Sequence, residues 1–542
     1  MHVGIGAIDR FTIAAYGVVL IAIAVYHSRK LKGQDDVFLA GRSMSRWPVA
    51  IAMYMALFST NTFIGMTGWL NRPNGTLWIG LHVAGIVLAV PLVVWLYPAL
   101  FFRLRITTAY EYLEKRFNYP VRAFAAVFFL ASRIMWMSTM LYATGLVIAM
   151  MFGWTGGEGF DDGQVWAILV VGSLGMIYCF VGGMHAVIWN DVFQFFVLMG
   201  GVVVMAVLAV VYSGGIGEVA DTAFDAGKLS PPPVFSLTDD ASLFVVLLSG
   251  FISMLSSTGA DQMLLQTYLT ARSEREAKRS LWRNGLCLKP LSIMFPLLGL
   301  IMFVYYSKHP EAAAHMTRPD DALAVFVGHV LPVGIRGVVV AAILSAVLDS
   351  LASGMAATSA SVQVDFIQRW RQHPLTGRQA VRLARILILV WGVTVTAAAL
   401  WVRTLGTNNN ILQILNIVMY PFAGVLLGVF LLGIVTLRAN AEGTLIGAAT
   451  GFLLTISLPL APRIVAWLAA RGALSAESWS WAEWLGQVSD FYYGGLATAA
   501  TFMVGYLGSL LFAPPRRPQL EGLTKWTPAL ADVPAEAAHS TT

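Results

Sequence analysis

Residues 50–70, AIAMYMALFSTNTFIGMTGWL, have the length and apolar character of a membrane-spanning helix, but the polar run STNT lies at their centre. Residues 247–266, LLSGFISMLSSTGADQMLLQ, are interrupted in the same way. Backbone groups freed at such breaks must be satisfied by protein or must line a cavity. The two breaks therefore predict an internally repeated membrane protein with a binding site between the repeats. Alternatively, the small polar residues only pack helices together.

The composition supports a membrane location. The chain of 542 residues is 57% hydrophobic and 12% charged, whereas soluble domains average about 25% charged residues. About 13 segments approach the spanning length of roughly 20 residues, which predicts an all-α integral membrane protein in a lipid bilayer. They lie at 9–28, 46–70, 77–102, 121–151, 164–182, 186–213, 241–268, 281–307, 333–366, 380–403, 410–436, 440–461 and 486–512.

Lysines and arginines gather in alternate loops, at 29–46, 103–122, 272–283 and 369–385. Cytoplasmic loops carry such an excess, so we expect the N-terminus outside the cell membrane and the C-terminus in the cytoplasm. The first span follows no basic segment and shows no clear cleavage site, which favours a retained helix. The net charge of +6 follows from the loops and gives no reason to expect nucleic acid as a partner.

The interrupted spans lie five helices apart, so we expect two halves of five helices each. The expected units are an extra helix and loop at 1–45, an inverted-repeat core at 46–436 (halves 46–213 and 241–436), two further helices at 437–512 and a tail at 513–542. Such a core places its site near the middle of the membrane. The sequence gives no indication of an oligomeric state.

One later span carries a polar stripe. Ala346, Asp349, Ser350 and Ser353 recur at i, i+3, i+4 and i+7, so they share a helix face. A hard monovalent cation prefers several oxygen ligands, and this face offers a carbonyl, a carboxylate and hydroxyls. The stripe therefore predicts a cation site. The alternative is a neutral Asp349 hydrogen-bonded to a neighbouring helix.

Other oxygen ligands for this cation are expected from two places. Carbonyls around Met55 and Phe58 would be freed at the break of the second span. Asp191 follows the glycine turn at 182–183, where it would either favour the positive end of a new helix or form a second ion station.

Further polar side chains within spans are candidates for binding a solute. They are Asp261, Gln262, Lys289, His82, Gln413 and Asn416. An intramembrane lysine indicates a functional site, but Lys289 would equally serve as a partner for Asp261. His82 would line a cavity or only pack, whereas Gln413 and Asn416 would hydrogen-bond hydroxyl groups.

Enzyme signatures are missing from the sequence. It contains no H-E-x-x-H, no phosphate-binding glycine loop and no nucleophile elbow. Its two cysteines, Cys179 and Cys287, support neither a disulfide framework nor a metal cluster. We therefore expect no enzymatic activity.

Seven stretches resemble the sodium:solute symporter family, especially its sodium/glucose cotransporter branch. They are FLAGRSMSRWPVA (38–50), STNTFIGMTG (59–68), GGMHAVIWNDVFQ (182–194), DQMLLQTYLTARS (261–273), LCLKPLSIMFP (286–296), LPVGIRGVVVAAILSAVLDSLAS (331–353) and GVFLLG (428–433). The resemblance implies a leucine-transporter-like 5+5 inverted repeat. It also implies sodium-coupled symport of a small polar solute by alternating access, first of all a sugar or polyol.

The resemblance also assigns residues. Sodium ligands would be Met55, Phe58, Ala346, Asp349 and Ser350, with Asp191 and Ser353 forming a second sodium site or relay. Solute contacts would be Ser59, Asn61, Thr62, His82, Lys289, Gln413 and Asn416. The chain departs from the family at Asp349, where a serine or threonine is usual.

Two alternatives remain open. Lys289 or a protonated His82 would suit uptake of a small carboxylate, amino acid or vitamin, and a buried Asp349 would be able to carry a proton in place of sodium. The second alternative is a different class of function, a membrane sensor that has a transporter fold.

Overall fold

The computed structural model describes residues 6–28, 33–58, 60–152, 154, 162–371, 375–404, 411–471 and 480–527. In these ranges the chain is helical, and its sole strand-like feature is an isolated bridge between Met44 and Ala271. The predicted all-α class is confirmed.

Eight helical segments of the described chain are long and apolar enough to cross a membrane, or ten if each bent pair is one span. The eight are Ala7–Ser28, Leu77–Leu104, Tyr119–Met151, Cys179–Tyr212, Glu274–Lys308, Ile335–Trp370, Gly377–Thr404 and Ala441–Pro462. Shorter apolar helices run over Gly163–Ile177 and Met419–Val435, and α23 (Tyr493–Ser509) covers the last expected span. Each expected span therefore has a helical counterpart.

Both interrupted spans are bent helix pairs. Helices α3 (Arg46–Leu57) and α4 (Thr60–Trp69) meet at 62°, and α11 (Leu243–Gly259) and α12 (Gln262–Leu269) meet at 60°. Helix α3 ends because Phe58 adopts an extended backbone, with φ −89° and ψ 120°. The predicted breaks are confirmed.

Helix α9 (Gly163–Tyr212) contains two of the expected spans in one element. Gly183 bends it with φ 58° and ψ −167°, a left-handed conformation that favours glycine. The second half, which carries Asp191, starts after this bend, as the sequence indicates.

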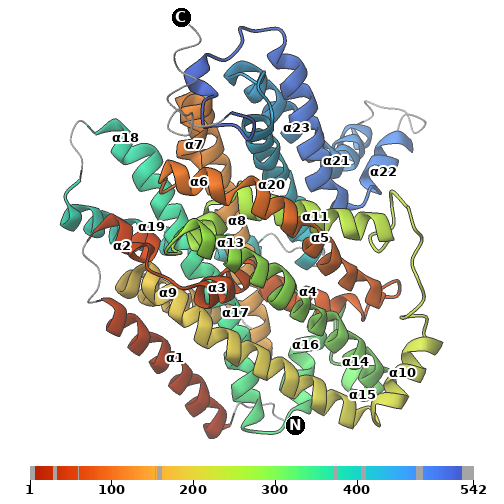
Figure 1. Cartoon of the computed structure of the whole chain (residues 1–542). Helices are drawn as coiled ribbons and strands as arrows, with labels where there is room; N and C mark the ends of the chain where they lie inside the picture. The colour runs from red at the N-terminus through yellow and green to blue at the C-terminus, as the bar shows by residue number, and fades with distance from the viewer. Residues whose placement is uncertain are drawn as a thin grey trace, which may run out of the picture.

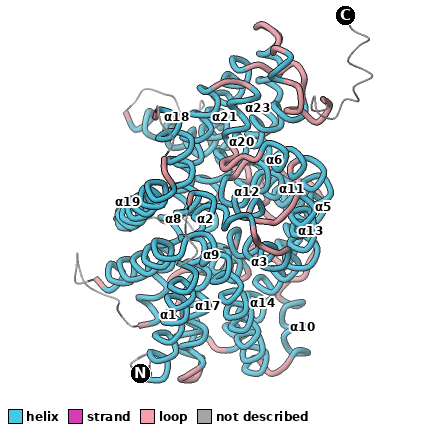
Figure 2. The backbone as a smooth tube through the Cα atoms, turned by 60° about the vertical axis from the view of Figure 1, so that its left-hand side comes forward, coloured by secondary structure: helices cyan, strands magenta, loops and turns pink. Residues whose placement is uncertain are grey.

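Helix α17 (Ile335–Ser361) lies at the centre of the molecule. In its most apolar window 94% of the residues are buried, and it packs along α9 and against α8 (Tyr119–Met151). Helix α1 (Ala7–Ser28) runs beside α9 and α17 at one side, while α20 (Ile411–Val435), α21 (Ala441–Ala470) and α23 pack together at the other (Figure 1 and Figure 2).

The described part of the C-terminal tail packs on the helices. The Tyr112 hydroxyl donates to the Leu523 carbonyl oxygen at 2.9 Å, and Lys525 Nζ donates to the Trp95 carbonyl oxygen at 2.7 Å. Residues 513–527 therefore join the body of the protein, whereas 528–542 lie outside the described ranges.

Candidate functional site

The end of α3 meets the polar stripe of α17. The Ser350 hydroxyl donates a hydrogen bond of 3.0 Å to the Phe58 carbonyl oxygen. Phe58 N donates to Met55 O at 2.9 Å, which closes the last turn of α3. A carbonyl oxygen has two lone pairs, so each of these oxygens can coordinate a cation beside the hydrogen bond that it accepts. The structure thus brings together the carbonyls and the stripe that the sequence singled out.

Asp349 does not face lipid. Its carboxyl group lies within hydrogen-bonding reach of the Asp191 carboxyl on α9, and both residues are almost completely buried. No donor in the described residues hydrogen-bonds to either carboxylate, and the Ser353 hydroxyl is likewise unbonded there. Two adjacent buried carboxylates are costly without a compensating positive charge. The pair therefore requires a cation or a proton.

Asp191 is not at a helix start. Helix α9 restarts after Gly183, so Asp191 lies about two turns further along a continuous helix. The interpretation of Asp191 as a residue that favours a helix N-terminus is therefore wrong, and its position opposite Asp349 supports the ion-station alternative.

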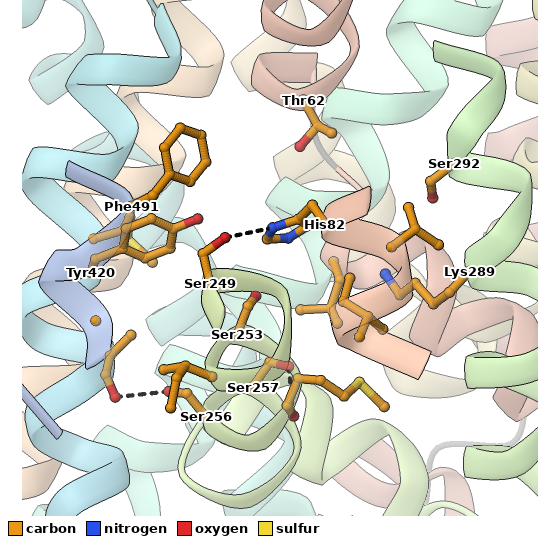
Figure 3. Close-up of a pocket in the computed structure, with 18 of the residues that line it drawn as sticks. Thr62, His82, Ser249, Ser253, Ser256, Ser257, Lys289, Ser292, Tyr420 and Phe491 are labelled. Atoms are coloured by element: carbon orange, nitrogen blue, oxygen red, sulfur yellow. Dashed lines mark hydrogen bonds between the residues drawn. The ribbon is translucent and has the colours of Figure 1, made fainter. Parts of the chain in front are cut away.

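A separate cavity of about 220 Å³ opens beside these carbonyls. It is lined by residues of α4, α5 (His82–Leu96), α11, the short helix η5 (Lys289–Ile293), α20 and the segment 491–495. Polar groups facing it include Thr62, His82, Ser249, Ser253, Ser257, Lys289 and Ser292. Figure 3 shows Lys289 and Ser292 on one side and the aromatic rings of Tyr420 and Phe491 on the other.

Lys289 brings a positive charge to the cavity. Its side chain is 6% exposed, and its ammonium lies 5.2 Å from the centre of the Tyr54 ring. Among the described residues no carboxylate forms an ion pair with it, because Asp261, which lines the same cavity, pairs with Arg133. Nearby, His82 Nδ1 hydrogen-bonds Ser249 Oγ at 3.0 Å (Figure 3). The cavity therefore contains a basic side chain without an acidic protein partner in the described chain.

Asp261 pairs with Arg133, so its predicted alternative pairing with Lys289 is wrong. The Arg133 guanidinium of α8 contacts the Asp261 carboxylate, and both residues line the cavity. The other Asp261 oxygen accepts a 2.8 Å hydrogen bond from Met263 N and so caps α12. Arg133 also lies 4.6 Å from the Trp136 ring centre. Arg133 lies within the expected span 121–151, and the sequence alone indicates no role for it.

Gln262 lies away from the described cavity lining. Its amide accepts from Ala109 N at 2.7 Å and donates to Thr107 O at 3.0 Å, which ties α12 to the loop before α7 (Tyr110–Arg116). The prediction that Gln262 contacts the solute is therefore wrong, because its amide joins two segments of the protein instead. Ser59 and the side chains of Asn61, Gln413 and Asn416 lie outside what the structure describes.

Sequence comparison now gives the family. Residues 37–451 match the model of the sodium:solute symporter family. The chain belongs to the sodium:solute symporter family. This symporter is a multi-pass membrane transporter coupled to sodium, and it is not an enzyme.

Relatives of this symporter agree with that assignment. It is 27% identical over 509 residues to the sodium/sialic acid symporter NanT of Aliivibrio fischeri, with 94% of each chain covered. It is 28% identical over 468 residues to human sodium-coupled monocarboxylate transporter 1, with 84% of this chain and 74% of the relative covered.

A solved structure supports the fold. A Na⁺-coupled sialic acid symporter in a substrate-bound, outward-open state, for which a novel Na⁺ site was described, superposes with a TM-score of 0.80 and 27% identity. The match covers 94% of this chain and 99% of the other. The symporter therefore has the leucine-transporter-like inverted-repeat fold, and it works by alternating access.

Proposed function

We propose that this symporter takes up a small organic carboxylate together with sodium. The observation that carries the proposal is Lys289, a buried ammonium that faces the cavity and for which the described residues supply no carboxylate. A solute carboxylate would provide the missing charge in a charge-assisted hydrogen bond. The sugar or polyol first expected from the sequence would leave Lys289 uncompensated.

The surroundings of Lys289 favour an anion as well. His82 lies on the neighbouring wall, and serine hydroxyls of α11 and Ser292 face the same space. Arg133 and Asp261 also line the cavity but pair with each other, so Lys289 is the cation left to bind a solute carboxylate. The relatives named for sialic acid and for monocarboxylates, both acidic solutes, support this choice.

We propose two cation positions. The first lies between the end of α3 and α17, with the carbonyls of Met55, Phe58 and Ala346 and the side chains of Asp349 and Ser350. The hydrogen bond between Ser350 and Phe58 supports it, because it brings a hydroxyl of α17 and a carbonyl of the broken helix within 3.0 Å of each other.

The second proposed position lies between Asp191, Asp349 and Ser353. The unbonded oxygens that these residues present within the described chain support it. The novel Na⁺ site described in the sialic acid symporter is consistent with a second ion.

The charges give the driving force. Two sodium ions and one carboxylate carry a net charge of +1 across the membrane. One charge moved across 100 mV gains about 2.3 kcal/mol, which sustains roughly fifty-fold accumulation before the sodium gradient is added. A membrane potential that is negative inside draws this net positive charge inward, so the coupled movement is uptake. The orientation of the termini stays a prediction.

Transport by purified protein in proteoliposomes tests the proposal. We expect sodium-dependent counterflow of a labelled aliphatic or aromatic monocarboxylate, and none when choline replaces sodium. Lys289→Met should raise the KM for the acid about ten- to a hundredfold, since a charge-assisted hydrogen bond contributes about 1.5–3 kcal/mol, whereas Lys289→Arg should retain part of the affinity. Lys278→Met, at a partly exposed lysine of α13 (Glu274–Arg283), is the matched control.

Other outcomes would decide among the alternatives. Counterflow of a neutral hexose but of no acid would contradict the proposed solute. Uptake that follows a pH gradient and ignores sodium would indicate proton coupling, for which the buried pair of Asp191 and Asp349 is the structural candidate. A sensor would show no counterflow with any solute.

A further inference from the structure

Helix α1 lies outside the inverted repeat, yet it is not simply a lipid-facing addition. Over 22 residues its buried side chains fall on one stripe, which comprises Asp9, Tyr16, Leu20, Ala24 and His27. This stripe faces α9 and α17, and both views show α1 alongside them (Figure 1 and Figure 2). These are the two helices that carry the Asp191 and Asp349 carboxylates.

At one end, α1 holds the start of α17. Asp9 Oδ1 accepts hydrogen bonds from Gly334 N at 2.8 Å and from Gly337 N at 2.7 Å. It thereby satisfies backbone donors at the beginning of α17, which that helix cannot satisfy itself. The approach is close, because a Cβ on Gly337 would lie 2.7 Å from Asp9 Cα. Asp9 therefore fixes the position of α17 along the axis of α1.

At the other end, α1 contacts α9 beside its bend. A Cβ on Gly182 would lie 3.1 Å from Ala24 Cα of α1 and 2.2 Å from Ala186 Cβ of α9, so glycine suits this close approach. The next residue, Gly183, is the left-handed position at which α9 restarts. Helix α1 therefore contacts both helices of the carboxylate pair, one near each of its ends.

Midway, Tyr16 joins the two helices directly. Its hydroxyl is 3.0 Å from Ser345 Oγ on α17 and accepts a 3.1 Å hydrogen bond from Gln194 Nε2 on α9. Ser345 lies one helical turn before Asp349, and Gln194 lies almost one turn after Asp191. Because these helical segments are continuous, the hydroxyl fixes their relative register one turn away from the carboxylates.

We infer that Tyr16 is a positioning residue for the ion site, and that α1 is a part of the ion-binding machinery. The Tyr16 hydroxyl sets the separation of α9 and α17 through Gln194 and Ser345, and so sets the spacing of Asp191 and Asp349. A cation is sensitive to that spacing, because its ligand distances are short and fixed. This inference rests on the proposed cation positions.

Sodium activation of uptake tests the role of Tyr16. Tyr16→Phe keeps the ring and removes both hydrogen bonds. The sodium concentration for half-maximal uptake should rise about three- to tenfold, as expected for the loss of one or two hydrogen bonds. The maximal rate at saturating sodium and the solute KM measured there should stay within about twofold of wild type. Tyr506→Phe, at an exposed position of α23, should change none of these values.

A second variant keeps the test independent of folding. Ser345→Ala removes the partner on α17, and sodium-dependent thermal stabilisation of purified protein reports binding without transport. Tyr16→Phe and Ser345→Ala should each shift the sodium midpoint, and the double variant should shift it by less than the product of the single effects.

The failures are distinguishable. An unchanged sodium midpoint in Tyr16→Phe, or a loss of folded protein with the midpoint unchanged, overturns the positioning role. Full sodium response in Asp349→Ala overturns the proposed ion site itself. A lost response in Asp349→Ala with an unchanged midpoint in Tyr16→Phe overturns the role of Tyr16 alone.

Discussion

Asp349 of α17 and Asp191 of α9 place two buried carboxyl groups within hydrogen-bonding reach of each other. The next residue along α17, Ser350, donates to the Phe58 carbonyl oxygen at the broken helix. Asp349 therefore borders both proposed cation positions. A cation bound on one side of this carboxylate lowers the cost of ionising it and so favours a cation on the other side.

Replacing Asp349 should separate the loss of a ligand from the loss of a charge. Asp349→Ala removes an oxygen from both proposed positions, and sodium-driven uptake should be abolished. Asp349→Ser restores the hydroxyl that is usual in the family, and part of the uptake should remain. Initial rates in proteoliposomes across a sodium series measure both.

The control for Asp349 is an exposed acid. Asp221→Ala, on α10 (Ile216–Asp225), should transport as wild type does. Full sodium-dependent uptake in Asp349→Ala would show that this carboxylate does not bind the coupling ion.

Asp191→Asn should change the stoichiometry of transport. The amide keeps the shape of the side chain but removes one negative charge, so the pair needs one positive charge fewer. The ratio of sodium to solute should fall from two to one, read from the membrane potential at which net flux in proteoliposomes reverses. Asp221→Asn, at the exposed acid of α10, should leave the ratio unchanged. A ratio of one in the wild type would contradict the second position.

The sequence was enough to predict the broken helices and the polar stripe of α17, because both depend on local patterns; that the stripe binds a cation stays a prediction. Polar residues at mid-span predict the bends, and the i, i+3, i+4 spacing places Asp349 and Ser350 on one face of α17. The meeting of Ser350 with Phe58 then followed from the resemblance and is present in the structure.

The remaining contacts depend on tertiary packing, which no local pattern specifies. Asp349 and Asp191 lie on different helices, and neither stretch by itself indicates that their carboxyl groups meet, although the resemblance already placed Asp191 with Ser353, one turn from Asp349. Asp261, beside the break between α11 and α12, pairs with Arg133 of α8 in place of Lys289. The aromatic wall of Tyr420 and Phe491 gave no sequence signal, since aromatic residues occur throughout the spans.

Replacing only Arg133 of the Arg133–Asp261 ion pair should destabilise the protein more than replacing both residues. Arg133→Gln leaves the Asp261 carboxylate in the membrane without its partner, and a broken buried pair typically costs about 3–5 kcal/mol. Asp261→Asn leaves the Arg133 guanidinium without its carboxylate. The asparagine oxygen can still accept the hydrogen bond from Met263 N that caps α12. The double variant leaves neither charge, so its melting temperature should lie above that of the Arg133→Gln single variant. Additive losses would show that the two charges do not interact.

A second ionic cluster, around Arg122, should contribute to the stability of the folded protein without affecting sodium coupling. Arg122 of α8 donates from Nε and Nη2 to Asp365 Oδ1 at 2.9 and 2.7 Å, and from Nη1 to Glu114 at 2.6 Å. Asp365 is completely buried, and Arg369 also donates to Glu114, at 2.9 Å. This cluster ties the start of α8 to the helical segment that follows α17.

Arg122→Ala should destabilise the protein by about 3–5 kcal/mol, because it leaves the Asp365 carboxylate buried without its cation. The melting temperature in detergent should fall by several degrees, while the sodium midpoint of the remaining folded protein stays unchanged. Arg382→Ala, on an exposed face of α19 (Gly377–Thr404), is the control. A shifted sodium midpoint in Arg122→Ala would instead connect this cluster to the ion site.

Acid should weaken the same cluster. Partial burial raises the pKa of the Glu114 carboxyl, but hydrogen bonds from Arg122 and Arg369 outweigh that effect and hold the pKa below its usual value. A lowered pKa in the folded state contributes stability above the unfolded value of about 4.3, and the contribution disappears as the pH falls through the folded value. Glu114→Gln should therefore lose less stability than wild type between pH 5 and the acid limit, about pH 3, as measured by thermal melts. Equal acid sensitivity in the two proteins would show that this carboxylate contributes nothing to the pH dependence.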